Sequence, residues 1–281
     1  MGIKLGLNAY GKNAVNLSKI IRHKDYHEFR QISVNVSLEG DFETAHTIGD
    51  NTKILPTDTQ KNTIYALAKE HFTSSIEAFG MVLSQHFQSN NPQVSKTKVE
   101  ITEYCWQRMI VDGVTHAHSF INSGSEKHVT TITQTNSNIQ ITSGMKDLLI
   151  LKTTDSAFVD YIRDQYTTLK EADDRIFSTF CEIEWDYVSV DVDFTVLYND
   201  IRTCLLKTFS SHKSLSVQHT LYAMGEDVLN SFSSVKEITL KMPNKHHIPA
   251  NLEPFGMENK NEIFIATDEP YGYITGTVTR D

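Results

Sequence analysis

The chain has 281 residues, of which 39% are hydrophobic, so it is long enough to bury a core without disulfide or metal staples. Its formal net charge of −9 argues against nucleic acid or an anionic membrane surface as a partner, because both require a positive field. No stretch approaches the roughly 20 apolar residues of a membrane-spanning helix. The widely spaced Cys105, Cys181 and Cys204 form no CxxC pair, which favours buried thiols in a soluble, intracellular protein.

The first half of the chain predicts two strands, two helices and two further strands. Hydrophobic residues alternate over 15–21 and 32–38, which is the period of half-buried antiparallel strands, and we expect a hairpin across residues 24–26. The spacing then changes to the i, i+3, i+4 pattern of helices over 64–71 and 76–87. Strand character returns at residues 99–106 and 129–133.

The second half shows the same order of elements. Strands are expected at 148–151 and 181–187, helices at 194–205 and 217–232, and closing strands at 236–242 and 262–266. The chain therefore predicts an α+β fold of two tandem ββααββ units, residues 1–136 and 137–281. Each unit would place two helices on one face of an antiparallel sheet and leave sheet edges to be covered, for which oligomerisation is the usual remedy.

Two segments in the first half carry candidate functional residues. Tyr10-Gly11-Lys12 stands just before the first predicted strand, and a lysine there is ordinarily a solvated surface residue. Residues 55–63 lead into the first helix and place Thr57 and Asp58 at its first turn. A helix N-cap explains that pair fully, but a helix terminus of this kind can also hold an anion.

Three segments in the second half add further candidates. Phe158 and Arg175 flank a polar stretch between two strands; singly they suit a core and a surface position, but together they suit a flat anionic ring. Val217 and Gln218 open a helix, where capping is the simpler interpretation, although free N–H groups and an amide can also bind a ligand. Asn244 and His246 share one face of an extended segment.

His116 and His118 form the one metal-like pattern in the sequence. Their spacing puts both rings on one face of a strand. Two ligands without an identifiable third fall short of a zinc site, so we do not predict a metal.

Five segments in this order resemble the urate oxidase (uricase) family, over nearly the whole chain. They are Tyr-Gly-Lys at 10–12, Thr-Asp-Thr-Gln-Lys-Asn-Thr at 57–63, Arg-Asp-x-Tyr-Thr-Thr-Leu-Lys-Glu at 163–171, Ser-x-x-Val-Gln at 214–218 and Pro-Asn-Lys-His at 243–246. The resemblance implies tandem tunnelling-fold units, two chains closing a barrel, and two barrels forming a homotetramer with active sites between subunits.

The resemblance also implies a role for each candidate residue. Phe158 would stack on urate, Arg175 and Gln218 would grip its pyrimidine side, and the Val217 backbone N–H would assist. From the neighbouring chain, Thr57 and the backbone of Asp58 would address the imidazole side. Lys12, Thr57 and His246 would form a proton relay, and Asn244 would hold oxygen or water above the ring.

The implied reaction is the oxidation of urate by O2 to 5-hydroxyisourate and hydrogen peroxide, without flavin or metal. The relay would remove a proton from the urate anion, and the clamp would stabilise the developing charge. The sequence departs from the family pattern at Pro56, where a small residue is expected, and it ends without the usual longer tail. Since there is no Ser-Lys-Leu ending, a cytoplasmic location is expected.

Two alternatives from other functional classes remain open at this stage. One is a zinc-dependent pterin synthase of the tunnelling fold that would use His116 and His118. The other is a purine-binding module that keeps the clamp without turnover, against which the joint presence of Lys12, Thr57 and His246 argues.

Overall fold

A computed structural model describes residues 2–281, which form two compact units. Unit 1 runs to Gly144 and includes Ser189–Tyr198, and unit 2 comprises Met145–Val188 and Asn199–Asp281. The domain boundary predicted between 136 and 137 lies in the turn between β4 (Val114–Thr135) and β5 (Ile139–Lys152). None of the helices within residues 2–281 is long and apolar enough to span a membrane.

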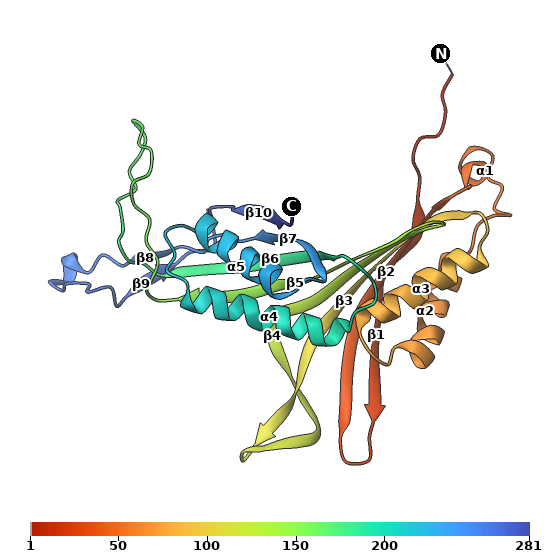
Figure 1. The fold of residues 1–281 in the computed structure, drawn as a ribbon, viewed down its shortest axis with the longest axis horizontal. Coiled ribbons are helices and arrows are strands. Elements are labelled where there is room, and N and C mark those ends of the chain that lie inside the picture. The colour runs from red at the N-terminus through yellow and green to blue at the C-terminus, as the bar shows by residue number, and fades with distance from the viewer. Residues whose placement is uncertain (1) are drawn as a thin grey trace. The chain divides into compact units, whose positions relative to one another are not determined.

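Unit 1 is an antiparallel sheet with helices on one face (Figure 1). The predicted hairpin across 24–26 is confirmed, because Arg22 pairs with His27. The strands lie in the order β1-β2-β3-β4, with β1 spanning Tyr10–Arg22, β2 His27–Gly40 and β3 Val94–Val111. The helices are α1 (Glu43–Thr47), α2 (Thr57–His71) and α3 (Ile76–Asn90).

The core of unit 1 follows from the two hydrophobic periods that the sequence shows. Alternate side chains of β2 are almost fully buried, from Ile32 to Leu38, and they face the apolar stripes of the helices. Helix α3 packs on β3 and β4, and α2 packs on β1. The buried side chains that meet between these layers include Val34, Val36, Ile64, Phe79, Leu83, Phe87 and Ile132.

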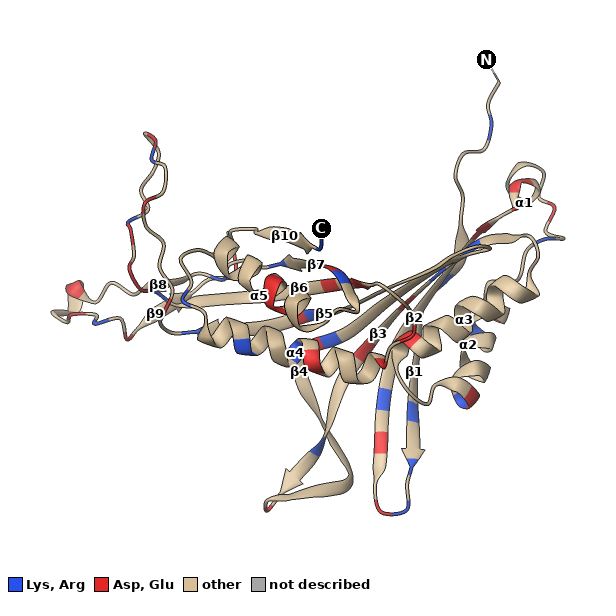
Figure 2. Cartoon of the chain, viewed as in Figure 1, with Lys and Arg blue, Asp and Glu red and all other residues tan. Residues whose placement is uncertain are grey.

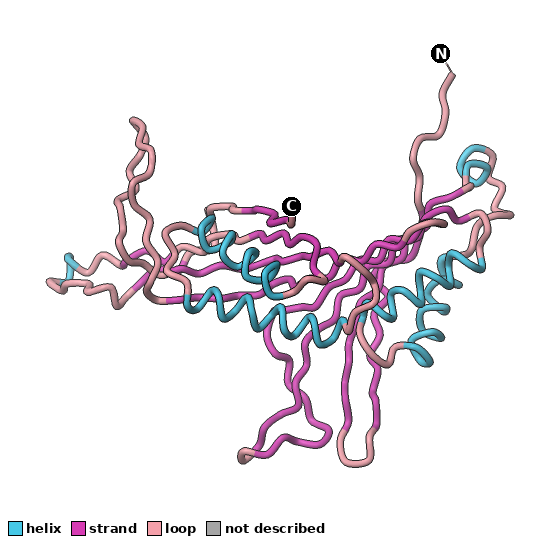
Figure 3. Tube along the Cα trace, viewed as in Figure 1, coloured by secondary structure: helices cyan, strands magenta, loops and turns pink. Residues whose placement is uncertain are grey.

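Unit 2 repeats this arrangement, with one correction to its last strand (Figure 3). Residues 262–266 were predicted to close the sheet, but β9 (Phe264–Ala266) pairs only with β8 (His247–Pro249) in a separate two-stranded sheet. The last strand of the sheet is β10 (Thr275–Thr279), which pairs with the edge of β7 that β6 does not occupy. The order is β5-β6-β7-β10, with β6 at Phe177–Tyr187, β7 at Val235–Lys241, α5 at Val217–Ser231 and the short 3-10 helix η1 at Glu253–Phe255. Helix α4 (Phe194–Ser211) begins within the Ser189–Tyr198 segment of unit 1 and continues in unit 2.

The sequence pattern does not indicate β10, because the side chains of this strand are small. A Cβ on Gly276 would meet Leu221 of α5 at 3.0 Å, and Val278 lies against Gly225 of the same helix. Because β10 sits so close to α5, it needs small residues there and shows little hydrophobic periodicity. Ile265 of β9 is 55% exposed, so its apolar pattern does not mark a core strand.

The charges and thiols are distributed as in an ordinary folded domain. Basic and acidic residues are interspersed on the strands and helices (Figure 2), so the net charge of −9 is not concentrated in one element. Within residues 2–281 no disulfide joins the three cysteines. Cys181 is buried, and burial raises the pKa of its thiol to about 12; Cys105 and Cys204 are half-buried instead of fully buried.

A buried charged cluster lies beneath α3 in unit 1. Glu77 is fully buried, and its Oε1 accepts hydrogen bonds from His128 Nε2 at 2.8 Å and Ser143 Oγ at 2.5 Å. Glu103 lies 3.9 Å from His128 and forms a two-pronged ion pair with Arg30, at 2.6 and 2.8 Å. Burial alone would raise the pKa of Glu77, but the His128 charge and these hydrogen bonds together lower it by more, so its pKa lies below the usual range.

Glu77→Gln should destabilise unit 1 by about 3 kcal/mol at neutral pH, because it replaces the buried carboxylate that pairs with His128 by a neutral acceptor. Ionised Glu77 stabilises the fold at pH values above the pKa that its carboxyl has in the unfolded chain. This stabilisation is lost as the pH falls through the lower pKa of the folded protein. The gap in melting temperature between wild type and variant, measured at one protein concentration, should therefore narrow below about pH 4.

The matched control is Glu70→Gln, because Glu70 faces His71 at 3.7 Å in an exposed pair that contributes little. A gap that stays constant from neutral pH to about pH 3 would show that ionised Glu77 does not stabilise the fold.

Candidate active site

The first motif lies inside β1, and not before it as predicted. Tyr10, Gly11 and Lys12 pair with Leu38, Ser37 and Val36 of β2. A Cβ on Gly11 would stand 1.8 Å from the Val36 carbonyl oxygen, so no other residue fits this close approach of the two strands. The motif is therefore fixed in the sheet by its backbone.

Tyr10 connects this strand to the segment that enters α2. Its phenolic oxygen accepts a hydrogen bond from the Leu55 N–H at 2.9 Å, and its ring packs edge-on against Phe42 with centroids 4.8 Å apart. Burial raises the pKa of Tyr10, an effect that the Leu55 hydrogen bond partly offsets, so the phenol is neutral. Two motifs 45 residues apart in sequence are thereby brought together.

Thr57 is the first residue of α2, and the N-cap is Pro56, which makes no side-chain cap hydrogen bond. The N-cap interpretation of Thr57 is therefore wrong. Within residues 2–281 no hydrogen bond engages the half-buried Thr57 hydroxyl. The hydroxyl and the first-turn N–H groups are the donors that this helix end presents.

Asp58, at the start of α2, has a lowered pKa. A hydrogen bond from Lys61 and its positive charge are the main causes that lower the pKa of Asp58; Asn62, whose Nδ2 donates at 3.0 Å, and the charge of Lys12 add to them. Lys12 is two residues from Tyr10, whose hydroxyl bonds to the Leu55 N–H, so Lys12 lies near the segment that leads into α2 at Thr57 and Asp58.

In unit 2 the structure brings Phe158 and Arg175 into contact. Phe158 and Ala172 exchange both backbone hydrogen bonds, at 2.8 and 3.1 Å, which folds the intervening loop back on itself. The Arg175 guanidinium lies 5.1 Å from the Phe158 ring centroid, and the Tyr161 ring stacks on Phe158 at 4.9 Å. Burial lowers the pKa of Arg175, although the guanidinium remains charged at any physiological pH.

The start of α5 lies beside this loop. Ala157 N–H donates to the Ser214 carbonyl at 2.8 Å, and Ser214 N–H donates to Asp155 at 2.9 Å. Ser216 is the N-cap of α5, since its hydroxyl accepts from the His219 N–H at 3.1 Å. Capping therefore accounts for Ser216, whereas Val217 is buried and Gln218 is exposed at the first turn.

Asn244 and His246 follow β7 along the edge of β6. The register that pairs Glu182 with Lys241 continues to Thr179 and Asn244, and Lys245 N–H donates to Ser178 at 2.8 Å. His246 follows two residues later, and its carbonyl accepts from the Thr267 N–H at 3.0 Å. Phe158 and Arg175 therefore lie beside the start of α5, and Asn244 lies beside β6, whereas no hydrogen bond between described residues joins His246 to this group.

His116 and His118 give no support to a zinc site. The Nδ1 atom of His116 accepts from the N–H groups of His118 and Ser119, at 3.3 and 3.1 Å, which occupies that potential ligand atom. Among residues 2–281 there is no group of three or more His, Cys, Asp or Glu side chains that could hold a metal ion.

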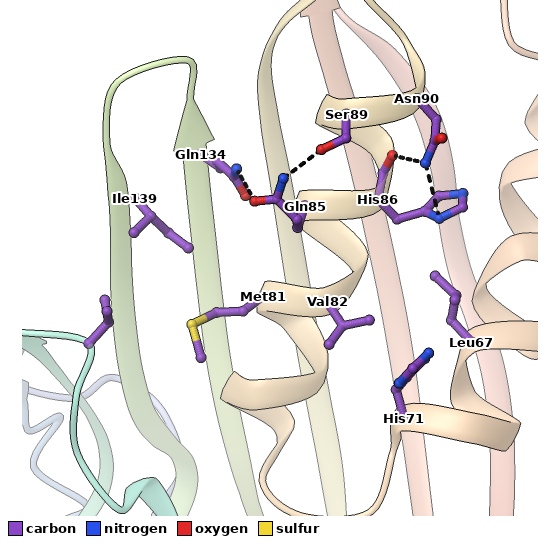
Figure 4. A pocket seen from close by; sticks show the side chains of 11 residues that line it. Leu67, His71, Met81, Val82, Gln85, His86, Ser89, Asn90, Gln134 and Ile139 are labelled. Carbon is purple, nitrogen blue, oxygen red and sulfur yellow. Dashed lines mark hydrogen bonds between the residues drawn. The ribbon is translucent and has the colours of Figure 1, made fainter.

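A groove of about 610 Å³ in unit 1 contains none of the predicted site residues (Figure 4). Polar side chains at its rim bond to one another: Gln134 donates to Gln85 at 3.1 Å, and Gln85 donates to Ser89 at 2.5 Å. These groups are engaged, so the groove suits a polar ring poorly. Its apolar lining includes Leu67, Met81, Val82 and Ile139.

Three residues that shape these regions, Tyr10, Tyr161 and Asp174, are not predicted as site residues from the sequence. Asp174 accepts from Thr154 Oγ1 at 2.7 Å and from Ser156 N–H at 3.2 Å, and these bonds fix the residue next to Arg175. No local pattern marks such contacts, because each joins residues 18 or 20 positions apart.

Comparison with known proteins gives one consistent result. The family model described as Uricase matches residues 8–133 and 141–275. The chain is 40% identical to a uricase of Arthrobacter globiformis over 99% of this chain and 91% of that protein, and 37% identical to a uricase of Oryctolagus cuniculus over 96% of this chain and 93% of that protein.

Solved structures agree in fold. A crystal structure of the Arthrobacter globiformis uricase superposes with a TM-score of 0.95, covering 100% of this chain and 96% of that chain. A urate oxidase from Bacillus sp. TB-90, at 23% identity, has a TM-score of 0.87 over 97% of this chain and 100% of that chain, which shows the shared fold alone. The full-length match and the 40% identity show that this chain is a member of the uricase family.

Proposed function

We infer that this chain oxidises urate with molecular oxygen: urate, O2 and one water give 5-hydroxyisourate and hydrogen peroxide. Family membership supports this activity, and the contact of Arg175 with Phe158 is the observation in this chain that carries it. An aromatic face beside a fixed guanidinium fork matches a flat ring that carries negative charge. The pterin synthase alternative has no support, since the described residues form no metal-ligand cluster.

The clamp comes from unit 2. Phe158 stacks on the purine, Arg175 and Gln218 bind the pyrimidine side, and the Val217 backbone N–H assists. The support for this assignment is local: the Phe158 loop is bonded to Ser214, only three residues before Val217. Burial keeps water from the Arg175 guanidinium and strengthens its attraction for an anion.

The proton relay begins in unit 1. Lys12 lies near the segment that leads into α2, and the Thr57 hydroxyl is free to exchange a proton, so the Lys12 amine in its unprotonated form accepts through Thr57 the proton that urate loses. The Asp58 backbone N–H contacts the imidazole side of the substrate. From unit 2, His246 completes the relay, and Asn244 holds the oxygen or water that attacks the ring.

The reaction needs no organic cofactor or metal in this proposal, because the doubly deprotonated purine gives its electrons directly to oxygen. The protein is a homotetramer whose sites combine unit 1 of one protomer with unit 2 of its neighbour. Each unit holds only part of the predicted set, and β1 and β10 end their sheets without a further strand among the described residues. Unpaired edges favour association with another chain.

The direct test is to add urate under air and to follow the loss of its ultraviolet absorbance together with oxygen uptake. Equal molar loss of urate and oxygen is expected from the stoichiometry above. Metal analysis of the active protein distinguishes the zinc alternative, since a stoichiometric metal whose removal abolishes turnover contradicts this proposal.

Arg175→Ala should weaken urate binding by about 2–5 kcal/mol, because it removes the charged partner of a buried anion. Binding of a non-reacting purine analogue, measured by calorimetry, checks this effect without turnover. Arg163→Ala is the matched control, since Arg163 lies in the same loop and pairs with Glu171 at 3.2 Å. Equal affinities of Arg175→Ala and wild type would remove Arg175 from the site.

Lys12→Ala and Thr57→Ala should each lower kcat by about 10²-fold or more, the scale of a lost acid–base group. The double variant should be little worse than the worse single one, because either change already disables the relay. Analogue binding should survive in Lys12→Ala, since the clamp remains. Additive losses of activation free energy would contradict a relay.

Mixing subunits tests the shared site. Lys12→Ala and Arg175→Ala chains should each be nearly inactive alone. Co-assembled in equal amounts, they should recover about a quarter of wild-type activity. About half of the random pairs are mixed, and one of the two sites in each mixed pair has both wild-type residues. Activity is assayed on tetramers isolated by size exclusion. No recovery in verified mixed tetramers, or a fully active monomer, would show that each site belongs to one chain.

A further inference from the structure

Strand β1 contains an extra residue immediately after Lys12. Lys12 pairs with Val36 and Val15 pairs with Val34, so Asn13 and Ala14 together stand opposite a single residue, Asn35. This arrangement is a β-bulge. Ala14 has φ +55, in the left-handed region that residues with a Cβ seldom occupy.

The bulge is held by a side chain of the neighbouring strand. The Ala14 N–H donates to Asn35 Oδ1 at 2.7 Å. A bulged residue loses its partner in the strand ladder, and an unpaired amide is costly, so the Asn35 carboxamide replaces the missing acceptor. Asn35 thereby stabilises a backbone conformation that Ala14 would not adopt by itself.

The bulge decides which way Lys12 faces. Opposed residues of an antiparallel pair share a face, so Lys12 faces the side where Val34 and Val36 are buried and where α2 packs on β1. Without the bulge, the register of Val15 with Val34 would pair Lys12 with Ser37. A slip of one residue turns every side chain to the opposite face.

Two neighbouring residues depend on the same register. Gly11 lies so close to the Val36 carbonyl that an added Cβ would stand 1.8 Å from it. Tyr10 reaches Leu55 only from the face on which it now lies, opposite Leu38. In the unbulged register Gly11 would pair with Leu38, and Tyr10 would lose its hydrogen bond with Leu55. The Tyr10–Leu55 hydrogen bond therefore favours the bulged form.

We propose that Asn35 is a positioning residue for urate oxidation: by accepting the Ala14 N–H it holds the bulge that turns Lys12 toward Thr57 and Asp58. The proposal rests on the proposed function, in which Lys12 is part of the proton relay. Asn35 does not touch substrate and acts only through the backbone that follows Lys12, at Ala14.

The test compares Asn35→Ala with Asn35→Asp, which keeps an acceptor oxygen at the same place. Asn35→Ala should lower kcat about tenfold or more and leave the affinity for a purine analogue unchanged. Asn35→Asp should stay within about threefold of wild type. Ala14→Gly should be fully active, and in the Asn35→Ala background it should restore kcat, because glycine adopts a positive φ without strain.

A second readout does not depend on turnover. Hydrogen exchange of the Ala14 amide should be slow in wild type and fast in Asn35→Ala, while the melting temperature and the exchange of β6 and β7 stay unchanged. If Asn35→Ala fails to fold, Asn35→Leu, which has a similar size and no acceptor oxygen, serves in its place. A folded Asn35→Ala variant with wild-type kcat would overturn the proposal, and so would one whose kcat Ala14→Gly does not restore.

Failure of the underlying function gives a different result. Wild type that does not consume urate, or a Lys12→Ala variant with full kcat, contradicts the proposed reaction or relay and with it the positioning role. A wild type that consumes urate and an inactive Lys12→Ala variant, combined with an unaffected Asn35→Ala variant, contradict the role of Asn35 alone.

Discussion

The register of β1 on β2 is the constraint on which the first half of the site depends. This register places Tyr10 where its hydroxyl meets the Leu55 N–H, and it places Lys12 on the face that α2 covers. One added residue in β1 separates this arrangement from the opposite one. The local cost at Ala14 is offset by the Asn35 hydrogen bond and by the contacts of Tyr10 with Leu55 and Phe42.

In unit 2 the second half of the site depends on backbone bridges instead of a regular sheet. Phe158 is joined to Ala172, Ala157 to Ser214, and Asn244 to both Thr179 and Gly272. A loop anchored at both ends and beside a helix start can hold a guanidinium against an aromatic ring without burying an unpaired charge deeply. The exposed tip of the loop between Phe158 and Ala172 does not take part in this contact.

The two units show the same physical design with different consequences. In both, helices cover one face of an antiparallel sheet, and two of the predicted site residues open a helix: Thr57 and Asp58 in α2, Val217 and Gln218 in α5. In unit 1 this helix start has no side-chain cap, whereas in unit 2 Ser216 caps it. An uncapped first turn leaves N–H groups and the Thr57 hydroxyl for another partner, which agrees with the role proposed for Thr57.

The sequence by itself determined the order of strands and helices, the two-unit pattern and the family, because hydrophobic periods and short motifs are local properties. Only the tertiary structure decided which strand completes unit 2, that Lys12 lies within a strand and faces α2, and that Arg175 stacks on Phe158. Each of these depends on pairings between distant residues: Thr275 with Lys241, Ala14 with Asn35, and Phe158 with Ala172. A strand of small residues gives little periodic signal, and a bulge changes the face of a side chain without changing the sequence pattern around it.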